Sequence, residues 1–507
     1  MERARHLLRS SLIVIAFLAA TKLTGLLRTR LVAAAFGTGS EIDAFTAANQ
    51  LPELFVTLIS AGALAAAFIP VYSASLSRDG RQSARLANSV ITLVLLALGA
   101  ISAVGILLAP WIAGQLVPGF PAEQQRLTAG LMRIILIQTT LFGVSGVLSS
   151  ILNAHQHFAL PALAPIGLDL GYLIGLNFFV PALGIQGLAW GTVAGALLHI
   201  AIQLPALWRY RFQLRPALDL RLAGVREVLR LMGPRIVTLG SVQLADLFII
   251  RLASGMGTGS TSGYFLAYYI MQLPETLFGT AIATVVFPTM AERYNAGDLD
   301  GLKRTAMGAL RIIWMLTIPS AVLLLVLGRQ AIGVVFQSGA FTGASTEIVY
   351  AILVAFALRI VSEASLEIVA RLFYAQHDTR TPMWVALGWL ALNVGLAFPL
   401  AEALGAPGLA WASTIAFSLQ SAALFLLNRR RLGDLDAGRL LRVGARGLLG
   451  GLALALVALA VQSALGDGLI SLLAAASAGV AAYLLVSYLA GARELADLLG
   501  LFRARLA

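Results

Sequence analysis

Long apolar segments recur along the whole of this 507-residue chain and constrain its fold more than any other feature. A helix of about 20 apolar residues crosses the hydrocarbon core of a bilayer. Only 12% of the residues are charged, whereas soluble proteins have about 25%. The sequence therefore predicts an all-α polytopic membrane protein with about 14 transmembrane helices. The expected spans are 11–36, 45–76, 87–110, 127–152, 160–181, 185–208, 226–254, 263–290, 305–328, 345–375, 381–402, 407–428, 441–464 and 468–491.

Lys and Arg are concentrated in alternate connections between these spans. The first residues, MERARHLLRSS, are basic, whereas loops such as 37–43 (GTGSEID) have no positive charge. Positive residues stay on the cytoplasmic side of a membrane, so we expect a multi-pass protein of the bacterial inner membrane with both termini in the cytoplasm. The net charge of +12 then reflects topology, and no nucleic-acid partner is expected. The chain has no cysteine, which excludes disulfides and thiolate metal sites.

Three short motifs occur twice, at offsets of 220 to 222 residues: GTGS (37–40 and 257–260), QLPE (50–53 and 272–275) and GLAW (187–190 and 408–411). A fourth pair of segments, LNAHQHFALP and FYAQHDTRTP (152–161 and 373–382), shares an alanine and a proline at an offset of 221. The repeat indicates two parallel lobes related by a pseudo-two-fold along the membrane normal, as in some secondary transporters. We expect an N-lobe over 1–222 (spans 1–6) and a C-lobe over 223–432 (spans 7–12). Residues 433–507 then hold spans 13 and 14 and an amphipathic cytoplasmic tail.

Basic residues inside the first span are the strongest functional signal. Lys22, Gly25 and Arg28 fall on one arc of the helix, opposite a face of Ile, Leu, Phe and Ala. A cation inside the bilayer costs at least about 2.5–3.5 kcal/mol unless it faces protein or water. We therefore expect Lys22 and Arg28 to line a polar cavity that binds an anion. Arg30 is expected to extend to the outer surface.

Acidic residues of the second, seventh and tenth spans are further candidates. Asp43 is expected near the outer surface, as a substrate contact or a solvated loop carboxylate. Glu53 follows a helix-breaking proline and could be the counter-ion of Lys22 or Arg28, or a first-turn acid. Asp246 could bind a coupling cation or pair with an arginine; Asn393 and Ser413 are further candidates for that ion.

Span ten has four charged residues spaced by four: Arg359, Glu363, Glu367 and Arg371. Such residues share one helix face and form i,i+4 pairs. They could neutralise one another against a neighbouring helix, or Arg359 could reach the cavity. His155, His157 and His377 are expected in loops at the ends of spans. No metal site is expected, and no sequence motif of a catalytic site is present.

Several segments resemble the MurJ (MviN-type) lipid II flippases of the multidrug/oligosaccharidyl-lipid/polysaccharide superfamily. They are TKLTGLLRTRLVAAAFGTGSEIDAF, QLPELFVTLISAGALAAAFIPVY, APWIAGQLVPGF, VVFQSGAFTGAST and FYAQHDTRTP. The resemblance extends over essentially the whole chain and implies a transporter, not an enzyme. The implied cargo is the undecaprenyl-pyrophosphate-linked disaccharide-peptide of peptidoglycan biosynthesis, moved to the outer leaflet by alternating access through a central cationic cavity. It further implies a monomer in contact with membrane lipids, without a cofactor, coupled to Na⁺, H⁺ or the membrane potential.

By this resemblance Arg28 matches the second arginine of the family's first-span motif, and Lys22 replaces the first. Gly25, Asp43 and Asp246 match the family's glycine, outer acid and seventh-span acid. The chain departs from many relatives at four positions: Val56, Thr57, Ala61 and Tyr269 stand where those relatives have charged residues. Two alternatives therefore stay open, a flippase for another undecaprenyl-pyrophosphate-linked oligosaccharide and a cation-coupled exporter of the multidrug (MATE) type.

Overall fold

A computed structural model describes residues 20–58, 64–77, 80–210 and 212–491 of the chain. These residues form helices joined by short turns, which confirms the predicted all-α class. Eleven helices within the described ranges are long and apolar enough to cross a membrane. The number of fourteen spans stays a prediction, since the start of the first span, Ala61 and the C-terminal tail lie outside the described residues.

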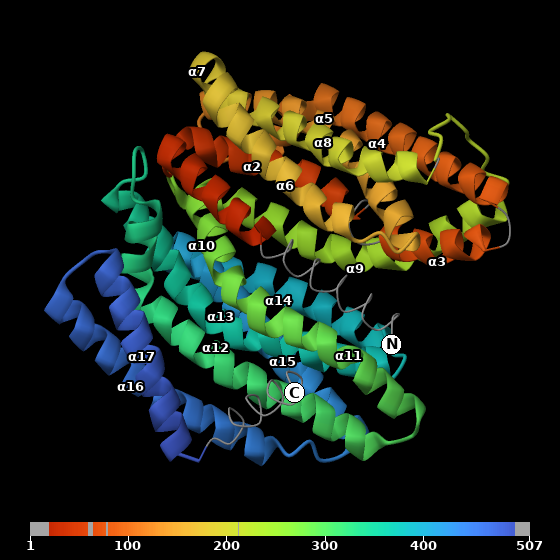
Figure 1. Cartoon of the computed structure of the whole chain (residues 1–507). Coiled ribbons are helices and arrows are strands. Elements are labelled where there is room, and N and C mark those ends of the chain that lie inside the picture. The colour runs from red at the N-terminus through yellow and green to blue at the C-terminus, as the bar shows by residue number, and fades with distance from the viewer. Residues whose placement is uncertain (1–19, 59–63, 78–79, 211, 492–507) are drawn as a thin grey trace. The chain divides into compact units, whose positions relative to one another are not determined.

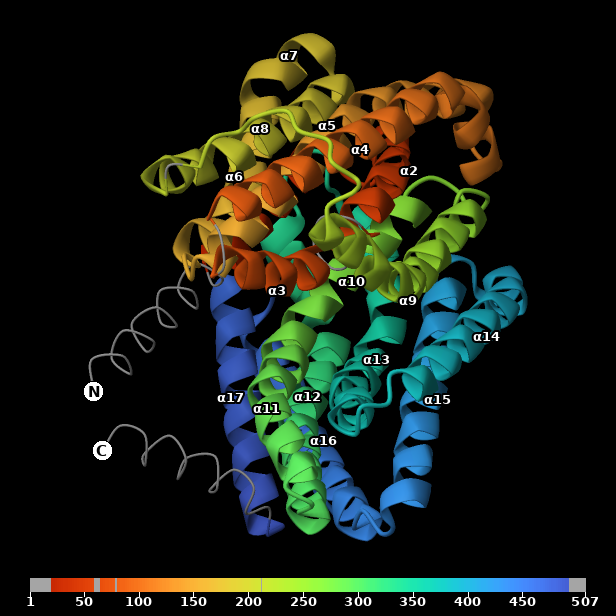
Figure 2. The same cartoon turned by 90° about the vertical axis from the view of Figure 1, so that its right-hand side faces the viewer.

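The chain divides into two compact units, residues 1–261 and 262–507. In unit 1, α5 packs against α2, α4 and α8, α6 packs against α8, and α9 packs against α3 and α4. Figures 1 and 2 show α4, α5 and α8 side by side. The helices are 20–36, α2 (Ser40–Phe55), α3 (Leu64–Leu76), α4 (Gly80–Leu116), α5 (Ala122–Ala154), α6 (Ala159–Ile174), the π-helix η2 (Gly175–Phe179), α7 (Val180–Leu183), α8 (Ile185–Arg209) and α9 (Ala223–Ala253).

Unit 2 is built around α13, which packs against α12 and α15. The last two helices form a hairpin that packs against α12 (Figure 1). The helices are α10 (Ser260–Glu275), which begins in the last residues of unit 1, the π-helix η3 (Thr276–Thr280), α11 (Ala281–Asn295), α12 (Leu299–Phe336), α13 (Gly343–Ala375), α14 (Arg380–Leu404), α15 (Ala406–Leu432), α16 (Ala437–Leu465) and α17 (Leu469–Leu489).

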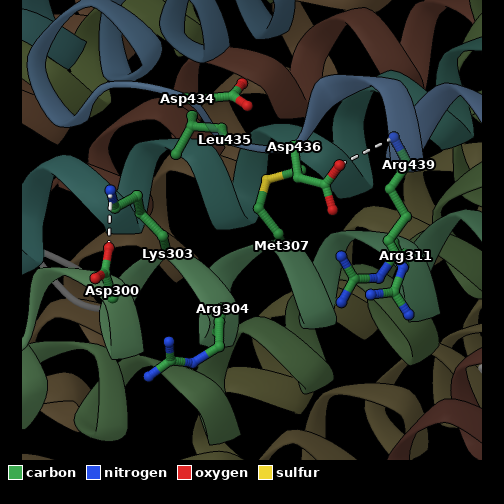
Figure 3. A pocket seen from close by; sticks show the side chains of 9 residues that line it. All are labelled: Asp300, Lys303, Arg304, Met307, Arg311, Asp434, Leu435, Asp436 and Arg439. Atoms are coloured by element: carbon green, nitrogen blue, oxygen red, sulfur yellow. Dashed lines mark hydrogen bonds and ion pairs between the residues drawn. The ribbon is translucent and has the colours of Figure 1, made fainter.

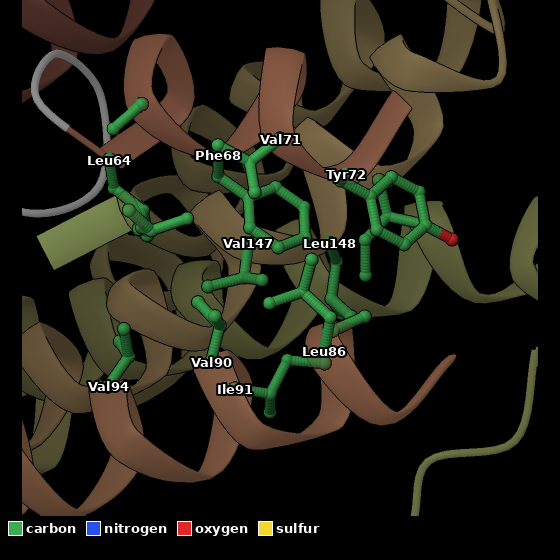
Figure 4. Close-up of a cluster of buried hydrophobic side chains, with 14 of the residues drawn as sticks. Leu64, Phe68, Val71, Tyr72, Leu86, Val90, Ile91, Val94, Val147 and Leu148 are labelled. Atoms are coloured by element: carbon green, nitrogen blue, oxygen red, sulfur yellow. The ribbon is translucent and has the colours of Figure 1, made fainter. Parts of the chain in front are cut away.

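The division between the units follows Thr261, whereas the sequence repeat suggested residue 222. Helix α9 accounts for the difference. Its residues Val225, Val228 and Met232 belong to a buried core of unit 1 that also includes Leu64 and Phe68 of α3. Figure 4 shows this core, where α3 faces the valines and leucines of α4 and α5. The repeat reports which stretches of the sequence resemble each other, whereas burial of apolar surface decides which unit a helix packs into.

The internal repeat is visible in the backbone. Helices α5 and α13 begin at Ala122 and Gly343 and both contain 33 residues. The turns after them contain a non-glycine residue with positive φ, at Gln156 (57°) and His377 (60°). Both QLPE motifs are followed by π-helical turns, at 56–58 and 276–280. The two copies of the sequence therefore have the same local structure.

The glycines of the two GLAW motifs have the same packing role. A Cβ on Gly187 would lie 2.4 Å from the carbonyl carbon of Phe179, and one on Gly408 would lie 1.9 Å from the carbonyl oxygen of Leu400. Each glycine lets a helix approach the backbone of the preceding helix more closely than a side chain allows. The repeated motif therefore marks two tight helix hairpins.

Candidate functional site

Arg28 forms the first predicted site together with a residue of α6. Its Nη1 lies 3.1 Å from Oδ1 of Asp169, whose side chain is 5% exposed, while that of Arg28 is 24% exposed. Thr24, one turn earlier, donates a hydrogen bond to Asp169 Oδ2 at 2.5 Å. The guanidinium also lies 4.9 Å from the ring centre of Tyr172. Arg28 therefore contacts protein groups of α6 within unit 1, and the cavity expected beside it stays a prediction.

The guanidinium of Arg28 keeps most of its hydrogen-bonding capacity. An arginine has five N–H donors, and the ion pair of Arg28 with Asp169 involves Nη1 alone. The side chain of Arg28 is one-quarter exposed, so the described residues do not enclose it. Asp169 and Tyr172 hold the planar fork in place, and a phosphate oxygen is the ligand that such a fork prefers.

Glu53 joins this group from α2. Its carboxylate accepts a hydrogen bond from Asn49 at 3.1 Å and its side chain is exposed. The charge of Arg28 acts on the Glu53 carboxyl group. Arg28, Glu53 and Asp169 all act electrostatically on the Tyr172 hydroxyl. The prediction that Glu53 lies near the charge of Arg28 is consistent with this cluster. The site therefore combines acidic and basic groups and is less purely cationic than expected.

The other positions of the first helix differ in their exposure. Lys22 and Arg30 are exposed, and neither forms an ion pair within the described ranges. Gly25 is buried, and its carbonyl accepts a hydrogen bond from the Thr29 hydroxyl at 2.8 Å. Arg28 is thus the cation of this helix that the structure places against protein groups.

Asp43 is fully buried rather than solvated. Its Oδ2 accepts a hydrogen bond from the backbone N–H of Gly259 at 2.6 Å. Gly259 has φ of 88°, a conformation that favours glycine. The two GTGS motifs are therefore linked directly, since Asp43 follows the first and Gly259 lies in the second. This contact gives Asp43 a structural role in unit 1.

Asp169 was not among the predicted site residues. It lies in the apolar segment ALPALAPIGLDLGYLI of α6, and it is the only charged residue of that segment. A lone carboxylate at membrane depth is a sign of a functional or paired site, so a signal was present. The sequence did not reveal that its partner would be Arg28, 141 positions earlier.

Arg359 occupies a different environment in unit 2. Its side chain is 6% exposed and its Nε lies 2.7 Å from Glu363 Oε2. Nη2 donates to Glu363 Oε1 at 3.2 Å, and Nη1 donates to Ser413 Oγ at 2.6 Å. The guanidinium carbon lies 3.7 Å from the ring centre of Phe417. All three guanidinium nitrogens of Arg359 donate hydrogen bonds within unit 2. This favours the interpretation that the charges of α13 neutralise one another over a contact between Arg359 and the substrate.

The rest of the predicted ladder is confirmed. Arg371 pairs with Glu367, one turn before it. Glu275, the repeat mate of Glu53, is 4% exposed and accepts hydrogen bonds from Thr276 and Thr280 at 3.4 and 3.3 Å. The two repeated glutamates thus differ in exposure and in partners.

The coupling-ion candidates lie in different units. Asp246 is half-buried on α9 of unit 1, whereas Asn393 and Ser413 are buried on α14 and α15 of unit 2. Asn393 Oδ1 accepts no hydrogen bond within the described ranges. Ser413 already accepts from Arg359, so a cation at its oxygen would meet a fixed positive charge. A shared site for the three residues stays a prediction.

His155, His157 and His377 lie at turns, as predicted. His155 and His157 follow α5, and His377 follows α13. Desolvation by burial lowers the pKa of His155 and of His157, and Arg209 adds to the lowering at His157. No group of three or more metal-ligating side chains occurs in the described part of the chain.

Comparison with known proteins identifies the family. The sequence model described as "Lipid II flippase MurJ" matches residues 32–478. The lipid II flippase MurJ of Burkholderia cenocepacia is 28% identical over 435 residues, 84% of each chain. A probable lipid II flippase MurJ of Rhizobium meliloti is 30% identical over 419 residues, 80% of this chain and 77% of that protein.

Solved structures show the same fold. A lipid II flippase MurJ in an inward closed conformation has a TM-score of 0.82 at 23% identity, covering 94% of this chain and 98% of that one. An inward-facing MATE transporter of the MOP superfamily has a TM-score of 0.68 at 16% identity, covering 84% and 99%. The family model matches most of the chain, and the fold agrees with it. This chain therefore belongs to the MurJ family of lipid II flippases.

Proposed function

We propose that this protein moves lipid II, the undecaprenyl-pyrophosphate-linked disaccharide-peptide, from the inner to the outer leaflet of the bacterial inner membrane. The accessible fork of Arg28, held by Asp169 and Tyr172, is the observation that carries the proposal. The pyrophosphate supplies the anion that this fork suits. The polar head group cannot cross hydrocarbon unaided, because each unpaired polar group costs several kcal/mol there. Alternating access removes that barrier without chemistry, so the protein acts as a transporter and not as an enzyme.

A leaflet-accessibility assay of labelled lipid II in cells depleted of this protein tests the function. Depletion should leave lipid II in the inner leaflet, and the wild-type gene should restore its appearance outside. Arg28→Ala should fail to restore it although the protein inserts normally. Arg28→Lys should be intermediate, since it keeps the charge and loses the planar fork.

Arg30→Ala is the matched control for this test. It removes the same charge from the same helix at an exposed position, so it should restore flipping. Unchanged flipping with Arg28→Ala would contradict the binding role of Arg28. Normal outer-leaflet lipid II in depleted cells would contradict the function itself.

A related cargo is the second candidate. Val56, Thr57 and Tyr269 replace charged residues of many relatives, which favours a different head group on the same undecaprenyl-pyrophosphate carrier. Competition by lipid-linked oligosaccharides of other composition in the same assay distinguishes the two. The MATE-type alternative requires an acidic site for organic cations, and exporter activity independent of Arg28 would support it.

We further propose that the protein works as a monomer, without a cofactor, and with both termini in the cytoplasm. Because Ser413 is engaged by Arg359, a proton gradient or the membrane potential suits the chain better than Na⁺ at that serine. Flipping in proteoliposomes under an imposed K⁺ diffusion potential, compared with an Na⁺ gradient, tests this preference. Transport driven by Na⁺ alone would contradict it.

A further inference from the structure

An exposed charged stripe runs along the first turns of α5 in unit 1, outside the site described above. It consists of Glu123, Arg126, Gly130 and Arg133, which follow one another at intervals of three or four residues and therefore share one helix face. The three charged side chains are exposed. A Cβ on Gly130 would meet nothing within 4 Å, so the helix surface between the two arginines is open. These four residues are called the α5 stripe below.

The charged groups of the α5 stripe have few partners in the protein. Among the described residues, neither Glu123 nor Arg126 forms an ion pair or a side-chain hydrogen bond. Arg133 donates one hydrogen bond, from Nε to the carbonyl oxygen of Ile106 on α4 at 3.2 Å. This bond holds the side chain against α4, and the four N–H groups of its two Nη nitrogens have no partner in the described part of the chain. The stripe therefore presents one carboxylate and two guanidinium groups to a ligand.

Charged side chains at two helix starts of unit 2 differ in this respect. Figure 3 shows them around a cavity of about 230 Å³ at the first turns of α12 and α16. Lys303 pairs there with Asp300, three residues before it, at 3.1 Å. Asp436 accepts a hydrogen bond from the backbone N–H of Arg439 at 3.3 Å. These carboxylates have partners within the protein, whereas the acid and the base at the same spacing of three residues on α5 do not pair.

The length of α5 places the α5 stripe at the surface of a membrane. Helix α5 has 33 residues and is apolar enough to cross a bilayer. At 1.5 Å per residue it is about 50 Å long, whereas the hydrocarbon core is about 30 Å thick. The first turns therefore extend into the head-group region. Glu123 then lies nearest to water, Arg126 lies one turn deeper, and Arg133 lies about 10 Å further along the helix, near the acyl chains.

This order of charges matches one class of phospholipid. In phosphatidylethanolamine the primary ammonium group points toward water, and the phosphodiester lies between it and the acyl chains. The carboxylate of Glu123 can accept hydrogen bonds from the ammonium group, while Arg126 and Arg133 bind the phosphodiester from either side of Gly130. An arginine at membrane depth also needs an anionic partner, which the phosphate supplies. We propose that the α5 stripe binds the head group of phosphatidylethanolamine, independently of the transported cargo.

Lipid retention by the purified full-length protein tests the proposal. Native mass spectrometry would compare dioleoylphosphatidylethanolamine with dioleoylphosphatidylglycerol, which has a phosphodiester but no ammonium group. The wild-type protein should retain phosphatidylethanolamine preferentially. Arg126→Gln/Arg133→Gln should weaken that binding about tenfold or more, because it removes both charged phosphate ligands. Glu123→Gln should abolish the preference and leave the binding of phosphatidylglycerol in place. All three side chains are exposed, so the variants should fold.

The matched control is Arg226→Gln/Arg230→Gln at the start of α9. Both arginines are exposed in unit 1, and Arg226 also donates from Nε to a backbone carbonyl, that of Leu220. This variant should retain the lipid like the wild type, and equal retention by the two double variants would overturn the proposal. Preferential retention of phosphatidylglycerol by the wild type would overturn the recognition of the amine. Displacement of the lipid by millimolar inorganic phosphate would overturn the lipid source and assign the two arginines to a soluble phosphate.

Discussion

Each unit contains an arginine paired with a carboxylate of a membrane-length helix, but the two pairs are built differently. Arg28 in unit 1 contacts one oxygen of Asp169 and stays 24% exposed. Arg359 in unit 2 is 6% exposed and binds both oxygens of Glu363 as well as Ser413. Arg28 forms its ion pair through Nη1 alone. By contrast, Nε, Nη1 and Nη2 of Arg359 each donate a hydrogen bond to a protein oxygen.

The difference shows that a charge inside a membrane span is not by itself a binding site. A buried pair is stable only when its hydrogen bonds are satisfied, and it then has little capacity for a ligand. A partly exposed arginine held by one carboxylate is positioned without being saturated. We therefore assign ligand binding to Arg28 and a structural role to Arg359.

Arg359→Ala should have the largest effect on stability. It leaves Glu363, whose side chain is only 14% exposed, without its ion-pair partner, a loss of about 3–5 kcal/mol. Arg28→Ala should lower stability less, because the Thr24 hydroxyl still donates a hydrogen bond to Asp169. Thermal unfolding of both purified variants checks this, and Arg359→Met/Glu363→Gln should recover much of the loss. Equal unfolding temperatures for the two single variants would contradict the claim that the Arg359–Glu363 pair contributes more to stability than the Arg28–Asp169 pair.

The glycines of the two repeated hairpins, Gly187 and Gly408, provide a case in which both units should lose stability to a similar extent on substitution. Gly187→Ala and Gly408→Ala each place a Cβ against backbone, and overpacking of this kind costs about 1–3 kcal/mol. Gly388→Ala on α14 has open space around the new methyl group and should be neutral or slightly stabilising. A strong effect in one unit alone, again by thermal unfolding, would show that the hairpins are not equivalent.

Asp169→Asn should have a smaller effect on stability, about 1 kcal/mol, because Arg28 remains partly hydrated and the amide still accepts one hydrogen bond. Flipping should nevertheless decline, since the guanidinium is no longer held in place. The leaflet-accessibility assay and thermal unfolding, performed together, separate the two effects. A variant with full flipping would show that Asp169 does not position Arg28.

The smallest expected effect is a pH dependence that differs between the two repeated turns. His155 has a lowered pKa because burial disfavours its charged form. As pH falls below about 6.5 the unfolded turn gains a proton that the folded turn resists, so the turn loses stability. Asp378 in the other turn is partly desolvated, but hydrogen bonds from Thr381 and Arg431 outweigh that effect and lower its pKa to about 2. Its stabilisation is lost only as pH falls from about 4 toward 2.

Hydrogen exchange, corrected for the intrinsic rate, checks this at pH 7.5 and pH 5. Protection around His155 should decrease at the lower pH, and protection around Asp378 should not change. His155→Gln should abolish much of the dependence in the first turn. Parallel changes in both turns would point to a global effect instead.

Local patterns in the sequence determined the helical class, the membrane-length segments and the internal repeat. They depend on hydropathy and on short motifs, and neighbouring residues carry that information. The ladder on α13 was equally predictable, because residues four apart share a helix face whatever surrounds them.

Tertiary structure alone decided the partners of the charged residues. Arg28 meets Asp169, Asp43 meets the backbone of Gly259, and Arg359 meets Ser413, and each contact joins segments more than fifty residues apart. No local pattern encodes such a pairing, because it depends on which helix faces pack together. Packing likewise placed α9 in unit 1, and it left Arg28 accessible while it enclosed Arg359, since exposure is a property of the assembled helices.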